Sequence, residues 1–183
     1  MTAAEKGFFP MTEPNGITIE RMKTEAQARA CARLMASSEP WITLRRDETG
    51  AMRNLYHPAA EVYVAEEKST VIGFIVLTMQ GPFRGYIATV GVVPERRGQG
   101  LGSRLIRFAE ERILREAPNV FLCVSSFNSR AQNLYRRLGY ERIGELRDFI
   151  VPGHAEILMR KSVAPLTEFR WPADDSPPPK KEG

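Results

Sequence analysis

A glycine-rich segment between an apolar run and a predicted helix carries the most chemically informative residues of this chain. The segment VVPERRGQGLGSRL, residues 92–105, holds three glycines and four charged residues. The first N–H groups of a helix have no partner inside it, and the helix dipole adds positive charge there. Glycines let an anion approach the backbone, and arginine side chains match phosphate oxygens. We therefore expect a pyrophosphate site with Arg97 nearby, formed by the amides of Gly98, Gln99, Gly100, Leu101, Gly102 and Ser103.

The glycine-rich segment has other possible interpretations. A P-loop of the Walker type is excluded because no Gly-Lys-Ser/Thr ends the segment. A dinucleotide-binding fold is disfavoured, since GQGLGSRL has Ser103 where G-x-G-x-x-G places its third glycine, and the chain shows no repeated parallel βαβ units. Taken alone, the segment also fits a glycine-rich turn with solvated arginines.

Composition and length restrict the class of protein. The 183 residues suffice for one well-buried core, and 43% hydrophobic with 26% charged residues is typical of a globular domain. No apolar run is long enough for a membrane span, and the N-terminus does not resemble a secretory signal. Cys31 and Cys123 have no metal-type spacing, so we expect reduced thiols and a cytoplasmic protein. The net charge of +4 is spread along the chain, which does not favour nucleic acid.

The hydrophobic pattern predicts an α+β domain with a mixed sheet. Its parts are a globular domain at 16–163, a flexible N-terminal extension at 1–15 and a Pro-rich polar tail at 164–183, whose LTEFRWP segment either docks or stays free. A hairpin is expected around Lys68 and Ser69. Strands are expected at 17–22, 61–67, 70–80, 85–93 and 120–126, with two more in 140–162, and helices at 25–38, within 39–58, at 100–117 and at 129–139.

Two motifs together resemble those of the GNAT superfamily, the Gcn5-related N-acetyltransferases. Arg97, Gly100 and Gly102 match its acetyl-CoA signature, and NSRAQNLYRRLGY, which begins at Asn128, is similar to its second motif. The resemblance covers roughly residues 17–161. It implies the three-layer GNAT fold, with a mostly antiparallel sheet of six to seven strands and about four helices. It also implies acetyl-CoA as the acyl donor and no metal.

The resemblance assigns roles to further residues. Val90, Gly91 and Val92 would pair with the pantetheine arm, and the Val92 amide would stabilise the oxyanion. Asn128 would bind the same arm, and Tyr135 would protonate the leaving thiolate as general acid. Each has a structural alternative: a β-bulge at Gly91, a helix cap at Asn128 and a packed core tyrosine at Tyr135.

The general base is not evident from the sequence. Relatives that acetylate protein N-termini carry a glutamate in the strand that matches VFLCVSS, where this chain has Cys123. A water chain remains open, as does a carboxylate such as Glu39 or Glu61. Glu39 and Trp41 are also candidates for acceptor binding, the alternative being a helix break with Trp41 in the core.

The sequence thus predicts an acetyl-CoA-dependent N-acetyltransferase in which a primary amine attacks the thioester directly. The acceptor is a small molecule or a peptide, and a homodimer is an assembly that the resemblance implies. The alternative, motivated by the missing glutamate, is a non-catalytic CoA-binding or regulatory module. His57 and His154 are isolated, so no metal site is expected, and neither a membrane nor a nucleic-acid partner is expected.

Overall fold

The computed structural model describes residues 11–12 and 16–170. Most of the predicted N-terminal extension and the tail beyond residue 170 lie outside this range. Residues 166–168 form a turn, and the amides of Glu168 and Phe169 donate to the carbonyl of Pro165.

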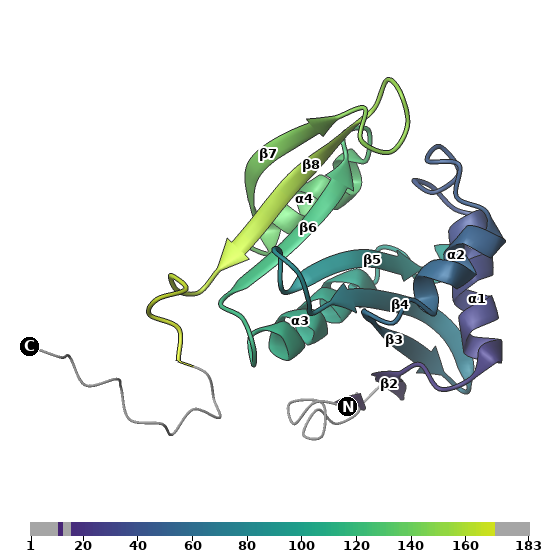
Figure 1. Cartoon of the computed structure of the whole chain (residues 1–183). Helices are drawn as coiled ribbons and strands as arrows, with labels where there is room; N and C mark the ends of the chain where they lie inside the picture. Colours follow the sequence, from purple (N-terminus) through teal and green to yellow (C-terminus); the bar gives the residue numbers. More distant parts are fainter. Residues whose placement is uncertain (1–10, 13–15, 171–183) are drawn as a thin grey trace, which may run out of the picture.

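One sheet runs through the molecule, in the strand order β1-β2-β3-β4-β5-β6-β8-β7 (Figure 1). All neighbours are antiparallel except β5 and β6, which are parallel. The α+β class with a mostly antiparallel mixed sheet is confirmed. The two-residue strand β1 adds to the six or seven strands that the sequence predicted. The strands are β1 (Met11–Thr12), β2 (Ile17–Arg21), β3 (Ala60–Glu67), β4 (Thr70–Thr78), β5 (Tyr86–Val92), β6 (Asn119–Ser125), β7 (Glu141–Arg147) and β8 (Ala155–Ser162).

Helices cover both faces of the sheet, which gives three layers. The helices α1 (Glu25–Ala36) and α2 (Glu48–Leu55) pack on one face, whereas α3 (Leu101–Ile113) and α4 (Ser129–Arg137) pack on the other. The central strands β3 and β4 are buried on both faces along their middle residues, which are mostly apolar in both strands.

Local sequence explains where most elements begin and turn. Thr24 caps α1 in a capping box with Gln27, and Asp47 caps α2. Lys68 and Ser69 both have positive φ, as a two-residue hairpin turn requires, so the predicted hairpin is confirmed. In contrast, α3 begins at Gly100 without any side-chain cap.

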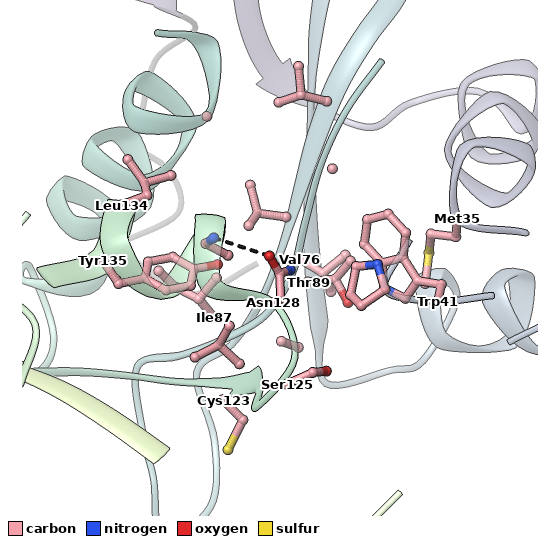
Figure 2. A pocket seen from close by; sticks show the side chains of 18 of the residues that line it. Met35, Trp41, Val76, Ile87, Thr89, Cys123, Ser125, Asn128, Leu134 and Tyr135 are labelled. Atoms are coloured by element: carbon pink, nitrogen blue, oxygen red, sulfur yellow. Dashed lines mark hydrogen bonds between the residues drawn. The ribbon is translucent and has the colours of Figure 1, made fainter. Parts of the chain in front are cut away.

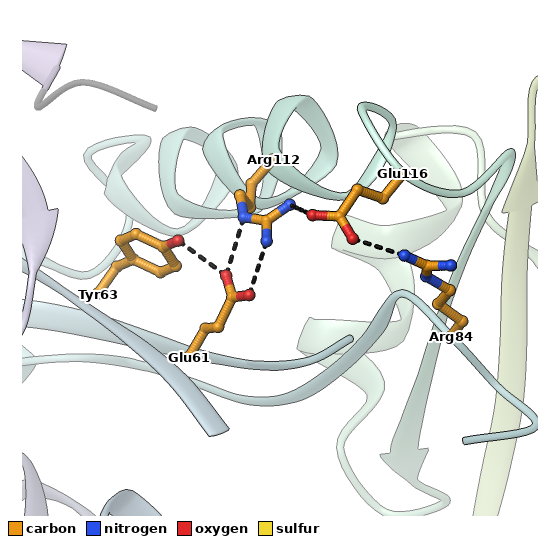
Figure 3. Close-up of polar contacts among 5 residues, drawn as sticks. All are labelled: Glu61, Tyr63, Arg84, Arg112 and Glu116. Carbon is orange, nitrogen blue, oxygen red and sulfur yellow. Dashed lines mark hydrogen bonds and ion pairs between the residues drawn. The ribbon is translucent and has the colours of Figure 1, made fainter. Parts of the chain in front are cut away.

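A buried cluster of charges ties β3, α3 and the β4–β5 connection together (Figure 3). Arg112 of α3 donates from Nε and Nη2 to the two carboxylate oxygens of Glu61, at 2.9 and 2.7 Å, and Tyr63 donates to the same carboxylate. On its other side Arg112 pairs with Glu116, which also binds Arg84. Each buried charge thereby has an opposite charge within reach.

The parallel strands β5 and β6 stay together for only a short distance. Their register has two residue pairs, Tyr86 with Phe121 and Ile87 with Leu122. Beyond these pairs β5 remains bonded to β4 and β6 remains bonded to β8, so the two halves of the sheet separate, as Figure 1 shows. This gap in the middle of the sheet positions the candidate site.

Candidate active site

The start of α3 presents a row of free backbone amides. Gly98 and Gly100 have φ of 80° and 84°, a region that other residues rarely adopt. The first amide of this helix that donates to a backbone carbonyl is that of Arg104, to Gly100. Within the described residues, the amides of residues 98–103 form no hydrogen bond to a protein acceptor. A Cβ at Gly100 would meet nothing within 4 Å, so the backbone is open to a ligand at this glycine, and unpaired amides at a helix start are a suitable site for a pyrophosphate.

The backbone of β5 also has free groups on the side of the gap. The amide of Val93 donates to the carbonyl of Ile72, and bonded pairs alternate along antiparallel strands. Gly91 therefore bonds toward β4, whereas the N–H and C=O groups of Val90 and Val92 point toward the gap. Both groups of Val90 and the amide of Val92 can thus pair with an extended ligand arm, whereas the carbonyl of Val92 already accepts from Arg97.

The structure explains the glycine at position 91 by packing in the core, which the sequence did not indicate. A Cβ at this position would lie 2.4 Å from a ring carbon of Phe74, so Gly91 makes room for a core side chain. The register of β4 and β5 shifts between Val76 and Leu77, which leaves Ala88 as the extra residue. The bulge of β5 is therefore at Ala88 and not at Gly91.

A pocket of about 1000 Å³ occupies the gap and opens toward both faces of the sheet. Figure 2 shows Leu134 and Tyr135 of α4 on one side of it, and Met35 and Trp41 on the other. Eleven of the predicted site residues line it: Glu39, Val90, Gly91, Val92, Arg97, Gly98, Gly100, Gly102, Ser103, Asn128 and Tyr135.

The side chains of two predicted site residues lie elsewhere. Leu101, the first residue of α3, is 1% exposed, and its side chain packs in the hydrophobic core. The amide group of Gln99 donates to the carbonyl of Glu95, outside the pocket. Only the backbone groups of these two residues remain available to a ligand.

Three arginines lie near the glycines, and each has different surroundings. Arg97 donates to the carbonyl of Val92 and to Ser38, both at 3.0 Å, so it joins the end of β5 to the end of α1. Arg96 pairs with Glu67 across a neighbouring turn. Arg130 of α4 lines the pocket, and its guanidinium lies 3.6 Å from where a Cβ at Gly98 would be. Arg130 was not predicted from the sequence, because its approach to Gly98 depends on how α4 packs.

Tyr135 packs in the core and also lines the pocket. It is 5% exposed and packs edge-on against Tyr140, with ring centroids 5.8 Å apart. Its phenol nevertheless points into the pocket (Figure 2). Burial raises the pKa of Tyr135, which keeps the phenol protonated at neutral pH.

Asn128 likewise serves both the fold and the pocket. Its Oδ1 accepts the amide of Ala131 at 3.1 Å and so caps α4. The hydrogen bond fixes the side chain at the wall of the pocket, beside Ser125 and Thr89 in Figure 2. Trp41 stacks against Phe74, with centroids 6.4 Å apart, and lines the pocket as well.

The candidate carboxylates lie in different places. The expectation that Glu61 could be the general base is wrong. Its carboxylate is held by Arg112 and Tyr63 on the α3 side of the sheet, and Glu61 does not line the pocket. Glu39 lines the pocket and accepts the amide of Thr43 at 3.3 Å. Glu156 of β8 also lines the pocket and was missed. It pairs with Ser125 in the β6–β8 register, which the local sequence does not encode.

The cysteines are thiols with limited reactivity. Burial raises the pKa of Cys31 to about 12, and burial also raises the pKa of Cys123, which lies on the pocket wall beside Tyr86. Among residues 11–12 and 16–170, no group of three His, Cys, Asp or Glu could hold a metal ion. In the same part of the chain, no helix has the length and apolar character to cross a membrane.

Comparison with known proteins agrees with this geometry. The acetyltransferase (GNAT) family matches residues 23–140. The N-alpha-acetyltransferase RimI of Mycobacterium tuberculosis is 32% identical, over 82% of this chain and 94% of its own length. An N-alpha-acetyltransferase of Sulfurisphaera tokodaii is 30% identical, over 58% of this chain and 70% of its own length. The ribosomal-protein-S18-alanine N-acetyltransferase of Escherichia coli has the same fold, with a TM-score of 0.64 and 19% identity, over 81% of this chain and 96% of its own.

The chain therefore belongs to the acetyltransferase (GNAT) family. It is an N-acetyltransferase that uses acetyl-CoA as its acyl donor and acts on an amine acceptor.

Proposed function

We propose that this enzyme transfers the acetyl group to the α-amine of a protein N-terminus. The observation that carries the proposal is the gap between β5 and β6, which joins a donor side to an acceptor side in one pocket. The donor side has the free amides at α3. The acceptor side has the carboxylates of Glu39 and Glu156 and the flat ring of Trp41, which suit a cationic amine. The names of two relatives, 32% and 30% identical, support an α-amine as acceptor.

On the donor side, the residues divide the work of binding. The amides of residues 98–103, with Arg97 nearby, hold the pyrophosphate. The free backbone groups of Val90 pair with the pantetheine arm, and Asn128 binds the same arm. This binding orients the thioester in the gap, where an amine can approach from the α1–α2 side.

The chemistry is direct attack of the amine on the thioester carbonyl. The amide of Val92 stabilises the negative charge that develops on the carbonyl oxygen. Tyr135 then donates its proton to the departing thiolate of coenzyme A. Glu39 attracts the amine to the pocket mouth. The products are the acetylated amine and coenzyme A.

A matched pair of peptides tests the acceptor. One peptide has a free N-terminus and an internal lysine, and the other has the same sequence with a blocked N-terminus. We expect thiol release only with the free peptide, and mass spectrometry should locate the acetyl group on the α-amine. Acetylation of the lysine in both peptides, or turnover only with small-molecule amines, would contradict the proposal.

We also propose that residues 16–163 form the catalytic domain, with 1–15 as an extension and 164–183 as a tail. The strands β2 to β8 and all four helices of the described residues lie within 16–163. Limited proteolysis of the full chain should remove both ends and leave this domain intact. An early cut inside it would contradict these boundaries.

A homodimer and a cytoplasmic location are part of the same proposal. The strand β7 is at the edge of the sheet and offers free backbone groups to a second copy. Light scattering after size exclusion should give twice the chain mass, and a monomer would exclude the dimer.

The proposed cytoplasmic location is supported by the cysteines. Cys31 and Cys123 are unpaired, which suits a reducing compartment. Fractionation of cells that express the tagged chain tests the location.

A further inference from the structure

A buried carboxylate on the acceptor side of the pocket has a serine as its hydrogen-bond partner. Ser125 Oγ donates to Glu156 Oε1 at 2.6 Å, and these residues face each other in the β6–β8 register. Ser125 is 2% exposed and Glu156 is 4% exposed, yet both line the pocket. The carbonyl of Ser125 accepts from the amide of Asn128 and from the side chain of Gln132, which fixes the serine at the edge of the gap.

Other buried carboxylates in this protein have structural partners. Glu61 binds Arg112 in two hydrogen bonds, and Glu110 binds Lys161 at 2.8 Å. Within the described part of the chain, Glu156 forms no ion pair. A buried charge without a paired cation is costly for the fold. Stability therefore does not explain why Glu156 is a carboxylate.

The surroundings of Glu156 suit a group that accepts a proton. Burial raises the pKa of Glu156, while the hydrogen bond from Ser125 and the charge of Arg46 act in the opposite direction. The other titratable groups that interact with it are Cys123 and Tyr86, both neutral at pH 7 because burial raises the pKa of each. A base whose pKa is raised toward the working pH transfers protons more efficiently.

We infer that Ser125 and Glu156 act as a relay that takes the proton from the attacking amine. This inference rests on the proposed N-acetyltransferase reaction. When the amine nitrogen bonds to the thioester carbon, it carries a proton in excess. That proton passes to Ser125 Oγ, while the Ser125 hydroxyl proton passes to Glu156 Oε1. Ser125 ends unchanged, and Glu156 is neutral until it releases the proton to water.

The relay also explains how the reaction can proceed with Cys123 in place of a glutamate. This residue occupies the place where the resemblance to N-terminal acetyltransferases would require a glutamate. Ser125 lies two residues further along β6 and therefore on the same face of the strand as Cys123, and both residues line the pocket. The carboxylate is thus supplied from the neighbouring strand β8.

Replacement of the carboxylate tests the relay. In Glu156→Gln we expect kcat to fall roughly 100-fold at pH 7, the usual contribution of a positioned base. Thermal stabilisation by acetyl-CoA should be unchanged. Glu110→Gln is the matched control, since Glu110 is a buried carboxylate that does not line the pocket. A kcat of Glu156→Gln within threefold of the wild type, or a loss equal to that of Glu110→Gln, would overturn the inference.

Two further readouts separate proton transfer from a purely structural role. Ser125→Ala should lose about as much kcat as Glu156→Gln, and the double variant should lose no more than either, because the two side chains act as one unit. Wild-type kcat in Ser125→Ala, or losses that multiply in the double variant, would overturn the relay.

The second readout is the dependence of kcat/KM on pH. On the acidic side, log(kcat/KM) should rise with pH with a slope near two in the wild type and near one in Glu156→Gln. Equal slopes would contradict the assignment.

These assays use any amine that the wild-type enzyme accepts. If peptides are not acetylated but another amine is, the proposed acceptor is wrong and the relay is still tested. If the wild type turns over while Glu156→Gln is unimpaired, the relay alone is wrong.

Discussion

The polar side chains of the pocket are each held by a contact with the fold. Asn128 caps α4, and Arg97 joins β5 to α1. Tyr135 packs against Tyr140. Such contacts hold a side chain in one conformation before the ligand binds, which reduces the entropy lost on binding. The site is therefore largely preformed in the free protein.

At the residue scale, Tyr135→Phe tests the general acid. The substitution keeps the aromatic packing and removes only the hydroxyl. Because burial raises the pKa of Tyr135, the wild-type phenol is protonated and can donate to the thiolate. We expect kcat to fall roughly 100-fold with little change in the KM for acetyl-CoA. An unchanged kcat would remove Tyr135 from the mechanism.

At the element scale, the buried charges between β3 and α3 hold the helix whose first turn forms the donor site. Glu61, Arg112, Glu116 and Arg84 form a chain of ion pairs from the sheet to the β4–β5 connection (Figure 3). The α3 helix contacts β4, β5 and β6, so it bridges both sides of the gap. The geometry of the gap thus depends on this helix.

The same cluster predicts how stability depends on pH. Burial alone would raise the pKa of Glu116, but hydrogen bonds and charges from Arg84 and Arg112 more than offset it and hold the pKa below 4.5. A carboxylate with a lowered folded-state pKa stabilises the fold above its unfolded pKa and loses this contribution as the pH falls through the folded value. Urea unfolding at pH 7 and pH 3.5 should show a larger loss of stability in the wild type than in Glu116→Gln. An equal loss in both would contradict this role.

At the scale of the whole molecule, local patterns predicted the elements, whereas contacts between distant segments were not predictable. The order of helices and strands followed from periodicity, and the amides at α3 followed from a contiguous glycine motif. The partner of Glu61 is 51 residues away and that of Glu156 is 31 residues away, so neither environment was evident from the sequence. The structural need for a glycine at position 91 was also not predicted, because Phe74, the side chain that leaves no room for a Cβ, lies on the adjacent strand. The strand β1 has two residues, too few for a periodic pattern.

The central claim is that the free amides at the start of α3 hold the pyrophosphate of acetyl-CoA. Gly102 is the best position for a test. It has no positive φ, and a Cβ there would make only ordinary contacts at 3.7 and 3.9 Å, so Gly102→Glu should fold. In contrast, any side chain at Gly100 would strain the backbone. Gly102→Ala serves as the control for the loss of glycine alone.

The most direct measurement is the thermal midpoint of the full chain with and without acetyl-CoA. At 100 times the Kd, the ligand should stabilise the wild type by about 2.7 kcal/mol, which is a rise of about 5–10 °C for a chain of this size. In Gly102→Glu, the carboxylate would face the phosphates, and we expect the Kd to rise roughly 100-fold and the shift to disappear. An unshifted wild type at millimolar acetyl-CoA, or an equal shift in Gly102→Glu, would contradict the account.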